Sequence, residues 1–147
     1  MEDPYDLASF VTAQNVDGTY ASALAELRAG RKTGHWMWFV FPQIAGLGQS
    51  EMSRRYAIAS RAEAGAYLQH VLLGPRLIEC TGVVDATRGR SATEIFGPVD
   101  ARKLQSCMTL FLRAAPGEPL FGRVLGRYFA GVPDRHTDQL LGRQGGA

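Results

Sequence analysis

The chain has 147 residues, of which 46% are apolar and 20% charged, and its formal net charge is +2. This length suits one domain, and the composition lacks the low hydrophobicity and high net charge of disordered chains. Its apolar runs are too short to span a bilayer, and its acidic start does not resemble a signal peptide. We therefore expect a single cytoplasmic domain over residues 1–147, with residues 144–147 as a frayed tail.

The sixteen basic residues, fourteen of them arginines, are interleaved with acidic residues and form no continuous basic stripe. Nucleic-acid binding is therefore not expected. The three histidines, His35, His70 and His136, are too far apart in the chain for metal-ligand spacing, so no metal site is predicted. The sequence also lacks the motifs of nucleotide-binding loops and redox cofactors, and we expect no cofactor.

The two cysteines, Cys80 and Cys107, are too few for a disulfide framework. Each lies beside apolar residues in a helical pattern, which predicts a buried, reduced thiol. A reactive Cys107 is the alternative, because Arg102 and Lys103 are close in the sequence and a nearby cation lowers the pKa of a thiol.

Apolar periodicity and helix-terminating residues predict an all-α fold, a single compact domain of about seven to nine helices, some of them short. The strongest starts are the capping-box sequences Ser60–Glu63 and Ser91–Glu94, and Asp100 is expected to cap a further helix. The expected helices cover residues 19–29, 60–69, 72–87, 91–97, 100–114 and 119–131, with a first helix from Asp3 and Pro4 and a last one after Pro133.

Residues 35–43 do not fit the helical pattern cleanly. This segment contains both tryptophans, Trp36 and Trp38, and its aromatic and β-branched content favours a strand. A short buried helix that ends at Pro42 is the alternative. In either case most of the segment belongs in the core, while its polar, glycine-containing flanks are also typical of a binding-site wall.

The same segment is part of a longer motif. Residues 31–43, RKTGHWMWFVFPQ, resemble the opening signature of a bacterial family known as domain of unknown function 1810. The segments 73–77, 94–97 and 103–111 are similar to later motifs of that family, in the same order. Where the family usually has Ser-Ser-Met-Thr, this chain has Ser106, Cys107, Met108 and Thr109, so any chemical role of the second serine is in doubt here.

The resemblance extends from about residue 6 to residue 141. It implies a compact, mainly α-helical monomer, with helix or turn rather than strand at the tryptophan segment. It implies no activity. Some relatives carry the label calpastatin, which describes disordered protease inhibitors, and the composition of this chain is the reverse of disordered.

His35 is the candidate catalytic residue. Arg31 precedes it by four positions, so in a helical turn both side chains would face one anion, and His35 could also act as a general acid–base. The competing interpretation is a histidine hydrogen-bonded at a helix end.

The helix expected over residues 100–114 has a polar stripe beside its apolar one. Spacings of three and four residues place the members of this stripe on one face, which is either an ordinary solvated surface or the wall of a cleft suited to phosphate. Lys103 and Asp100 lie next to the stripe and can pair with each other. The stripe consists of Arg102, Ser106, Thr109 and Arg113.

Two functions follow from these patterns, and the sequence leaves open whether the protein is an enzyme. The first is binding of a small anionic or nucleotide-like ligand, with hydrolysis assisted by His35 as the accompanying reaction. The alternative is a protein–protein interaction or regulatory module without catalysis, which requires exposure of Trp38, Phe41 and Tyr56. The expected ligand-binding residues are Arg31, His35, Trp36, Trp38, Gln43, Lys103, Ser106 and Thr109.

Overall fold

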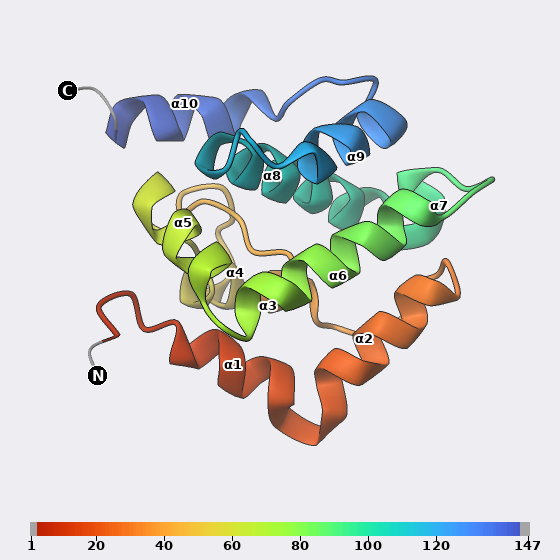
Figure 1. The fold of residues 1–147 in the computed structure, drawn as a ribbon, viewed down its shortest axis with the longest axis horizontal. Coiled ribbons are helices and arrows are strands. Elements are labelled where there is room, and N and C mark those ends of the chain that lie inside the picture. Colours follow the sequence, from red (N-terminus) through yellow and green to blue (C-terminus); the bar gives the residue numbers. More distant parts are fainter. Residues whose placement is uncertain (1–2, 145–147) are drawn as a thin grey trace.

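The computed structural model describes residues 3–144, which form helices around one core (Figure 1). The all-α prediction is confirmed, since the described residues contain no strand beyond an isolated bridge between Ile44 and Ile58. The elements are α1 (Ala8–Asn15), the 3₁₀ turn η1 (Val16–Gly18), α2 (Thr19–Arg28), α3 (Met37–Val40), α4 (Glu51–Arg55), α5 (Arg61–Gln69), α6 (Leu73–Ala86), α7 (Ala92–Phe96), α8 (Pro98–Ala114), α9 (Pro119–Phe129) and α10 (Arg135–Gln144).

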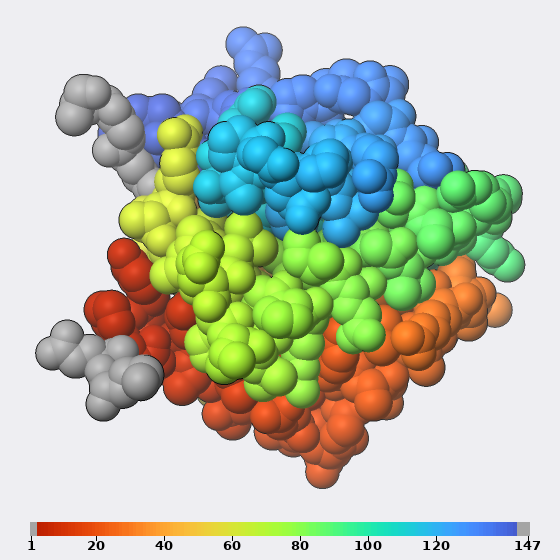
Figure 2. Space-filling model, in the orientation of Figure 1, coloured from red at the N-terminus to blue at the C-terminus, as the bar shows by residue number. Residues whose placement is uncertain are grey.

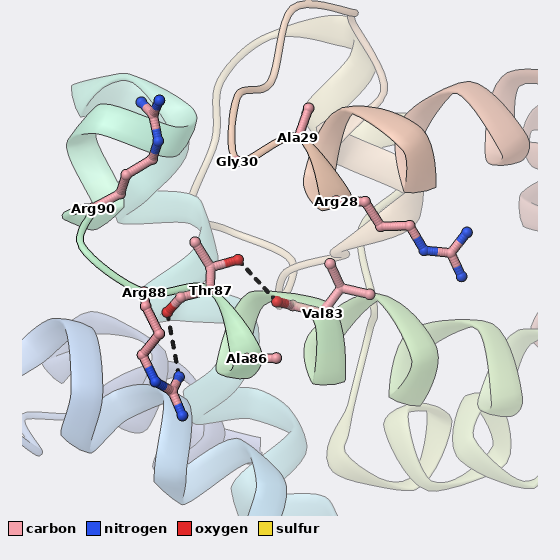
Figure 3. Close-up of a pocket in the computed structure, with 8 residues that line it drawn as sticks. All are labelled: Arg28, Ala29, Gly30, Val83, Ala86, Thr87, Arg88 and Arg90. Atoms are coloured by element: carbon pink, nitrogen blue, oxygen red, sulfur yellow. Dashed lines mark hydrogen bonds between the residues drawn. The ribbon is translucent and has the colours of Figure 1, made fainter.

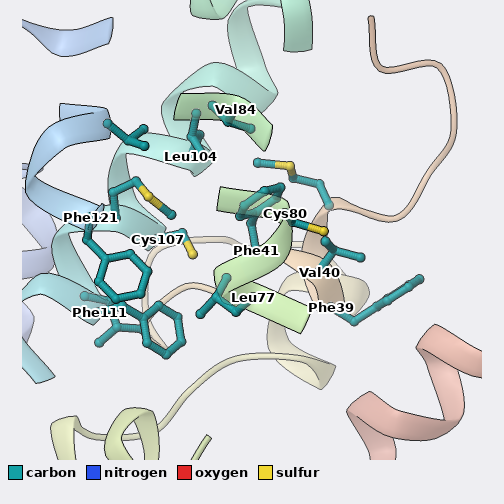
Figure 4. Packing of buried hydrophobic residues seen from close by; sticks show 14 of the residues in the cluster. Phe39, Val40, Phe41, Leu77, Cys80, Val84, Leu104, Cys107, Phe111 and Phe121 are labelled. Carbon is teal, nitrogen blue, oxygen red and sulfur yellow. The ribbon is translucent and has the colours of Figure 1, made fainter. Parts of the chain in front are cut away.

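The long helices α6 and α8 organise the fold. Helix α8 contacts α5, α7, α9 and α10, and α6 contacts α2, α5 and α9. Figure 2 shows α6 as a green band between the N-terminal helices, in red and orange, and the C-terminal helices, in blue. Helices α6 and α8 both contribute apolar side chains to the core seen in Figure 4. The residues labelled there include Phe41, Leu77, Cys80, Leu104, Phe111 and Phe121.

The first helix begins later than the sequence predicts. Asp3 does act as a cap, because its carboxylate oxygens accept hydrogen bonds from the Leu7 and Ala8 amides at 2.8 and 2.9 Å. Those two amides, Ala8 first, lower the pKa of the Asp3 carboxyl. The helix itself starts at Ala8, since Asp6 has a φ of 53°, in the left-handed region that a right-handed helix excludes.

Helix α8 begins at Pro98 rather than after Asp100. Gly97, with a φ of 82°, ends α7 and provides the turn, and Pro98 is tolerated as the first helical residue. Asp100 therefore lies inside the first turn, where its carboxylate is available for other partners. The start of the helix is thus displaced by three residues, and the Asp100 carboxylate does not cap it.

Of the two predicted capping boxes, the structure contains one complete box and one half. Ser91 and Glu94 form the complete box, with both reciprocal hydrogen bonds. Ser60 caps α5 through the Glu63 amide, but the Glu63 carboxylate accepts from the Ala59 amide instead of the Ser60 amide. The short helix α4 was not predicted, because one turn is too short to show apolar periodicity.

The tryptophan segment is a single helical turn, α3, so the interpretation as a strand is wrong and the short buried helix is right.

Both cysteines are buried and free, as predicted. Burial raises the pKa of the Cys107 thiol well above its usual value, which contradicts the reactive alternative. Within residues 3–144, no helix is long and apolar enough to cross a membrane. Of the tail expected over residues 144–147, Gln144 is the last residue of α10, and residues 145–147 lie outside the described residues.

Candidate functional site

Two of the cavities on the described part of the chain are similar in size and have basic residues in their walls. The Lys103 cavity has a volume of about 520 Å³ and is lined by Gln43, Leu47, Gly48, Ser53, Val99, Arg102, Lys103, Gln105, Ser106, Asp134 and His136. The Arg88 cavity, shown in Figure 3, has a volume of about 460 Å³ and is lined by Arg28, Ala29, Gly30, Val83, Ala86, Thr87, Arg88 and Arg90. Both volumes lie in the range of about 300–1,000 Å³ that is typical of small-molecule sites.

Both lysines of the chain bind one carboxylate at the edge of the Lys103 cavity. Lys32 Nζ lies 2.8 Å from Asp100 Oδ2, and Lys103 Nζ lies 3.3 Å from Asp100 Oδ1. The Lys32 ammonium also donates to the Gly34 carbonyl, and its side chain is only 7% exposed, against 20% for Lys103. Because one carboxylate neutralises one ammonium, this Lys32–Asp100–Lys103 triple carries an excess positive charge.

Each ammonium of the triple also lies over an indole ring. Lys32 Nζ is 5.0 Å from the centre of the Trp36 ring, and Lys103 Nζ is 5.0 Å from that of Trp38. Such cation–π contacts are favourable by about 0.5–2 kcal/mol, more when they are shielded from water. The two tryptophans therefore support the lysines, and through Lys103 they support one wall of the cavity.

Trp36 is fixed in turn by Glu26 of α2. Glu26 Oε1 accepts hydrogen bonds from Trp36 Nε1 at 2.9 Å and from the Thr33 and Gly34 amides at 2.7 and 2.8 Å. Burial favours a higher pKa for Glu26, but the hydrogen bonds from these amides and the indole outweigh it and lower the pKa. A Cβ at Gly34 would lie 2.8 Å from Trp36 Cδ1, so only glycine fits here.

Three of the four members of the polar stripe of α8 contact α10 or the residue before it, whereas the fourth, Arg102, is exposed. The Ser106 hydroxyl lies 3.0 Å from Asp134 Oδ2, and Thr109 Oγ1 accepts from the Asp134 amide at 2.7 Å. Ser106 and Thr109 are both buried. Farther along α8, Arg113 forms a bidentate ion pair with Asp138, with N–O distances of 2.9 and 3.0 Å. The interpretation as a solvated face is therefore wrong for Ser106 and Thr109, which are buried against Asp134, the residue that precedes α10. No local pattern in α8 reveals this partner.

These contacts bring the N-terminal end of α10 to the cavity. Asp134 caps that end, since its Oδ2 accepts from the Thr137 amide at 3.1 Å and from the Thr137 hydroxyl. His136, in the first turn, is exposed and lines the cavity. Sequence reasoning assigned no role in the site to Asp134 or His136, and no spacing within the chain connects them with α8.

The predicted ligand residues are divided between the cavity, its support and the surface. Gln43, Lys103 and Ser106 line the cavity. Trp38 supports Lys103, whereas Trp36 and Thr109 are buried and bind Glu26 and Asp134. Arg31 and His35 are exposed and line neither cavity. The segment 31–35 is not helical, so the four-residue spacing that was expected to aim both at one anion does not apply.

The two cavities lie at opposite ends of their helices. The Lys103 cavity includes Val99, the second residue of α8, and Asp134 and His136 at the start of α10. The Arg88 cavity includes Gly30 and Thr87, just after the ends of α2 and α6. Because helix N-termini carry positive and C-termini negative partial charge, the backbone favours an anion in the first cavity and disfavours it in the second.

Arg88 has a structural role at the end of α6. Arg88 donates to the carbonyl oxygens of Asp85 and Thr87 at 2.9 and 3.4 Å. In Figure 3 the guanidinium groups of Arg28, Arg88 and Arg90 point in different directions and do not converge on one point. Basic side chains commonly compensate the exposed carbonyls of a helix C-terminus in this way.

The fold and the cavity define an all-α domain with a cation-lined cleft along the N-terminal half of α8 and at the start of α10. The family described as "Protein of unknown function (DUF1810)" matches residues 4–141, and the chain belongs to this family. The chain is also similar to the crystal structure of the conserved hypothetical protein Rv1873 from Mycobacterium tuberculosis, with 57% identity and a TM-score of 0.91 over 95% of this chain and 98% of that chain. No curated protein matches the chain.

Proposed function

We propose that the protein binds a small anionic ligand in the Lys103 cavity. The observation that carries the proposal is the charge at the cavity wall, where three cations face two carboxylates. Arg102, Lys103 and Asp134 line the cavity, and Lys32 and Asp100 lie at its edge. Asp100 serves two ammoniums, and Asp134 accepts hydrogen bonds from Ser106 and Thr137. An anion would balance the excess charge, and the two helix N-termini add to the attraction.

The arrangement favours binding over covalent hydrolysis. The Ser106 hydroxyl is within hydrogen-bond distance of Asp134 and of the Arg102 carbonyl, and no hydrogen bond in residues 3–144 joins it to an imidazole. A serine nucleophile needs a base within about 2.6–3.2 Å. His35, the residue expected to assist hydrolysis, does not line the cavity. The imidazole available to a bound ligand is that of His136.

The alternative of an interaction module has less support. It depends on exposure of Trp38, Phe41 and Tyr56, but Phe41 and Tyr56 are buried and Trp38 is partly covered by Lys103. Two of its three anchor residues are therefore unavailable to a partner.

The chain offers a direct test, because it contains only two lysines and they differ in exposure. Lysine side chains are acetylated through their neutral amine form, and peptide mass spectrometry reports the rate at each lysine. Inorganic phosphate, sulfate, phenyl phosphate and adenosine monophosphate would be tested as protecting anions. We expect an anion present at about ten times its Kd to slow acetylation of Lys103 by about tenfold. The less exposed Lys32 serves as the internal reference.

Arg102→Gln and Arg88→Gln are the matched variants for this test, because both arginines are exposed and each lines one of the cavities. Arg102→Gln should remove the protection and Arg88→Gln should keep it. Unchanged Lys103 rates with every anion, in a protein whose melting curve is normal, would refute the proposal.

A further inference from the structure

The Lys103 cavity has apolar as well as cationic walls. Leu47 and Val99 line it, and the Val99 side chain is 65% exposed. Val132, which is 55% exposed, lies close by, since its carbonyl accepts a hydrogen bond of 2.9 Å from Gln105, another lining residue. Val99 therefore presents an exposed apolar side chain to the cavity, and Leu47 adds a second apolar side chain to its wall. An apolar part of a ligand would cover these two side chains and remove their surface from water.

The size of the cavity also indicates more than a bare ion. A volume of about 520 Å³ suits a ligand with an organic part, since sites of about 300–1,000 Å³ accommodate small organic molecules. An inorganic anion at Arg102 and Lys103 would leave the region beside Leu47 and Val99 unfilled.

The donors of the cavity wall favour a head group with several oxygen atoms. Arg102 offers a planar fork suited to two oxygen atoms, and Lys103 offers a compact ammonium only partly neutralised by Asp100. A carboxylate brings one negative charge to this pair, whereas a phosphate monoester brings about −1.5 to −2 near neutral pH, with three acceptor oxygens.

We infer that the ligand of the Lys103 cavity is a phosphate monoester with an apolar or aromatic organic group, its phosphate at Arg102 and Lys103 and its organic group on Val99. This inference rests on the proposed function and specifies the class of ligand. Gln43 and His136 supply further polar contacts at the same wall.

Isothermal titration calorimetry with three probes tests the inference: phenyl phosphate, inorganic phosphate and benzoate. Burial of the phenyl ring against the valine should make phenyl phosphate bind about tenfold more tightly than inorganic phosphate. The second negative charge should make it bind about fivefold more tightly than benzoate. Equal affinity for phenyl phosphate and inorganic phosphate, or tighter binding of benzoate, would overturn the inference.

Comparison of Val99→Ser with Val71→Ser distinguishes a contact between the ligand and Val99 from a general effect of replacing an exposed valine. Both valines are exposed, but Val71 lies in the turn before α6 and lines neither cavity. Val99→Ser should reduce the preference for phenyl phosphate over inorganic phosphate about threefold, with inorganic phosphate unaffected, and Val71→Ser should not change it. If no anion binds at all, the proposed function itself fails. If anions bind without a preference for the organic ester, only the inference fails.

Discussion

The Lys103 cavity and the Arg88 cavity resemble each other in volume and in having arginines in their walls, but helices present opposite ends to them. At the Arg88 cavity, α2 and α6 end, and Arg88 donates to helix carbonyls. At the Lys103 cavity, α8 and α10 begin, and a carboxylate shared by two lysines leaves positive charge unbalanced. A count of basic residues therefore does not identify an anion site. A cation beside a helix C-terminus is already attracted to the carbonyl groups of that helix, whereas a cation beside a helix N-terminus is not.

The largest expected difference between the two cavities is in anion affinity. Lys103→Gln should weaken binding of phenyl phosphate by about 10- to 100-fold, since hydrogen bonds to charged groups contribute about 1.5–3 kcal/mol. The variant should fold normally, because Asp100 keeps Lys32 as its partner. Arg88→Gln should leave the affinity unchanged. Titration calorimetry of both variants checks the prediction. Equal losses of affinity for phenyl phosphate would show that the two cavities do not differ in anion binding.

Asp100→Asn should have opposite effects on stability and on binding. Loss of the carboxylate leaves the nearly buried Lys32 without its counter-charge, and we expect the free energy of unfolding to fall by about 2 kcal/mol. The value lies below that for a fully buried pair, because Asp100 and Lys103 are partly exposed. Anion affinity should rise about threefold, because a negative charge is removed from the site.

Asp85→Asn is the matched control for this prediction. Asp85 also serves two cations, Arg123 at 3.2 Å and Arg127 at 3.5 Å, but these arginines are more exposed and lie away from the Lys103 cavity. The expected loss of stability is about 0.5–1 kcal/mol, with no change in anion affinity. Urea denaturation with and without phosphate measures both quantities. A loss of anion affinity in Asp100→Asn would show that the triple does not carry excess positive charge.

Thr109→Val tests how α10 is held at the Lys103 cavity. The change keeps the shape of the side chain but leaves the Asp134 amide without its acceptor, and we expect a loss of about 1.5 kcal/mol. Thr81→Val is the control, because the buried Thr81 hydroxyl donates only to the Leu77 carbonyl within its own helix. Hydrogen exchange should show faster opening of α10 in Thr109→Val alone. Identical losses in the two variants would contradict the anchoring role.

The smallest expected effect is the pH dependence of Glu26. Its folded pKa lies below its usual value, so the ionised carboxylate stabilises the fold at neutral pH, and this stabilisation disappears as pH falls through the lowered pKa. Glu26→Gln should therefore cost about 1 kcal/mol near pH 7 and progressively less towards about pH 3. Urea denaturation over that range checks the trend. A difference that stays constant with pH would show that charge plays no part in holding Trp36.

Local sequence patterns predicted much of the fold and only part of the site. The spacing of apolar residues and the capping serines identified most helices, because these signals act within one or two turns. The same patterns failed at α3 and α4, where one helical turn is too short to show a period. At the site, Gln43, Lys103 and Ser106 line one cavity, but His35 lies at the surface because the segment before it is not helical.

The sequence by itself determined the helical class, the family and the burial of the aromatic and cysteine residues, because local periodicity, motif order and hydrophobicity are properties of the chain. The sequence also predicted the pairing of Lys103 with Asp100, which lie three residues apart in α8. Tertiary packing alone decided that Lys32 meets Asp100, that Ser106 and Thr109 of α8 meet Asp134, and that His136 joins the cavity. Each of these contacts joins residues from separate elements. Their electrostatic consequences depend on distance and helix direction in space, which spacing along the chain does not encode.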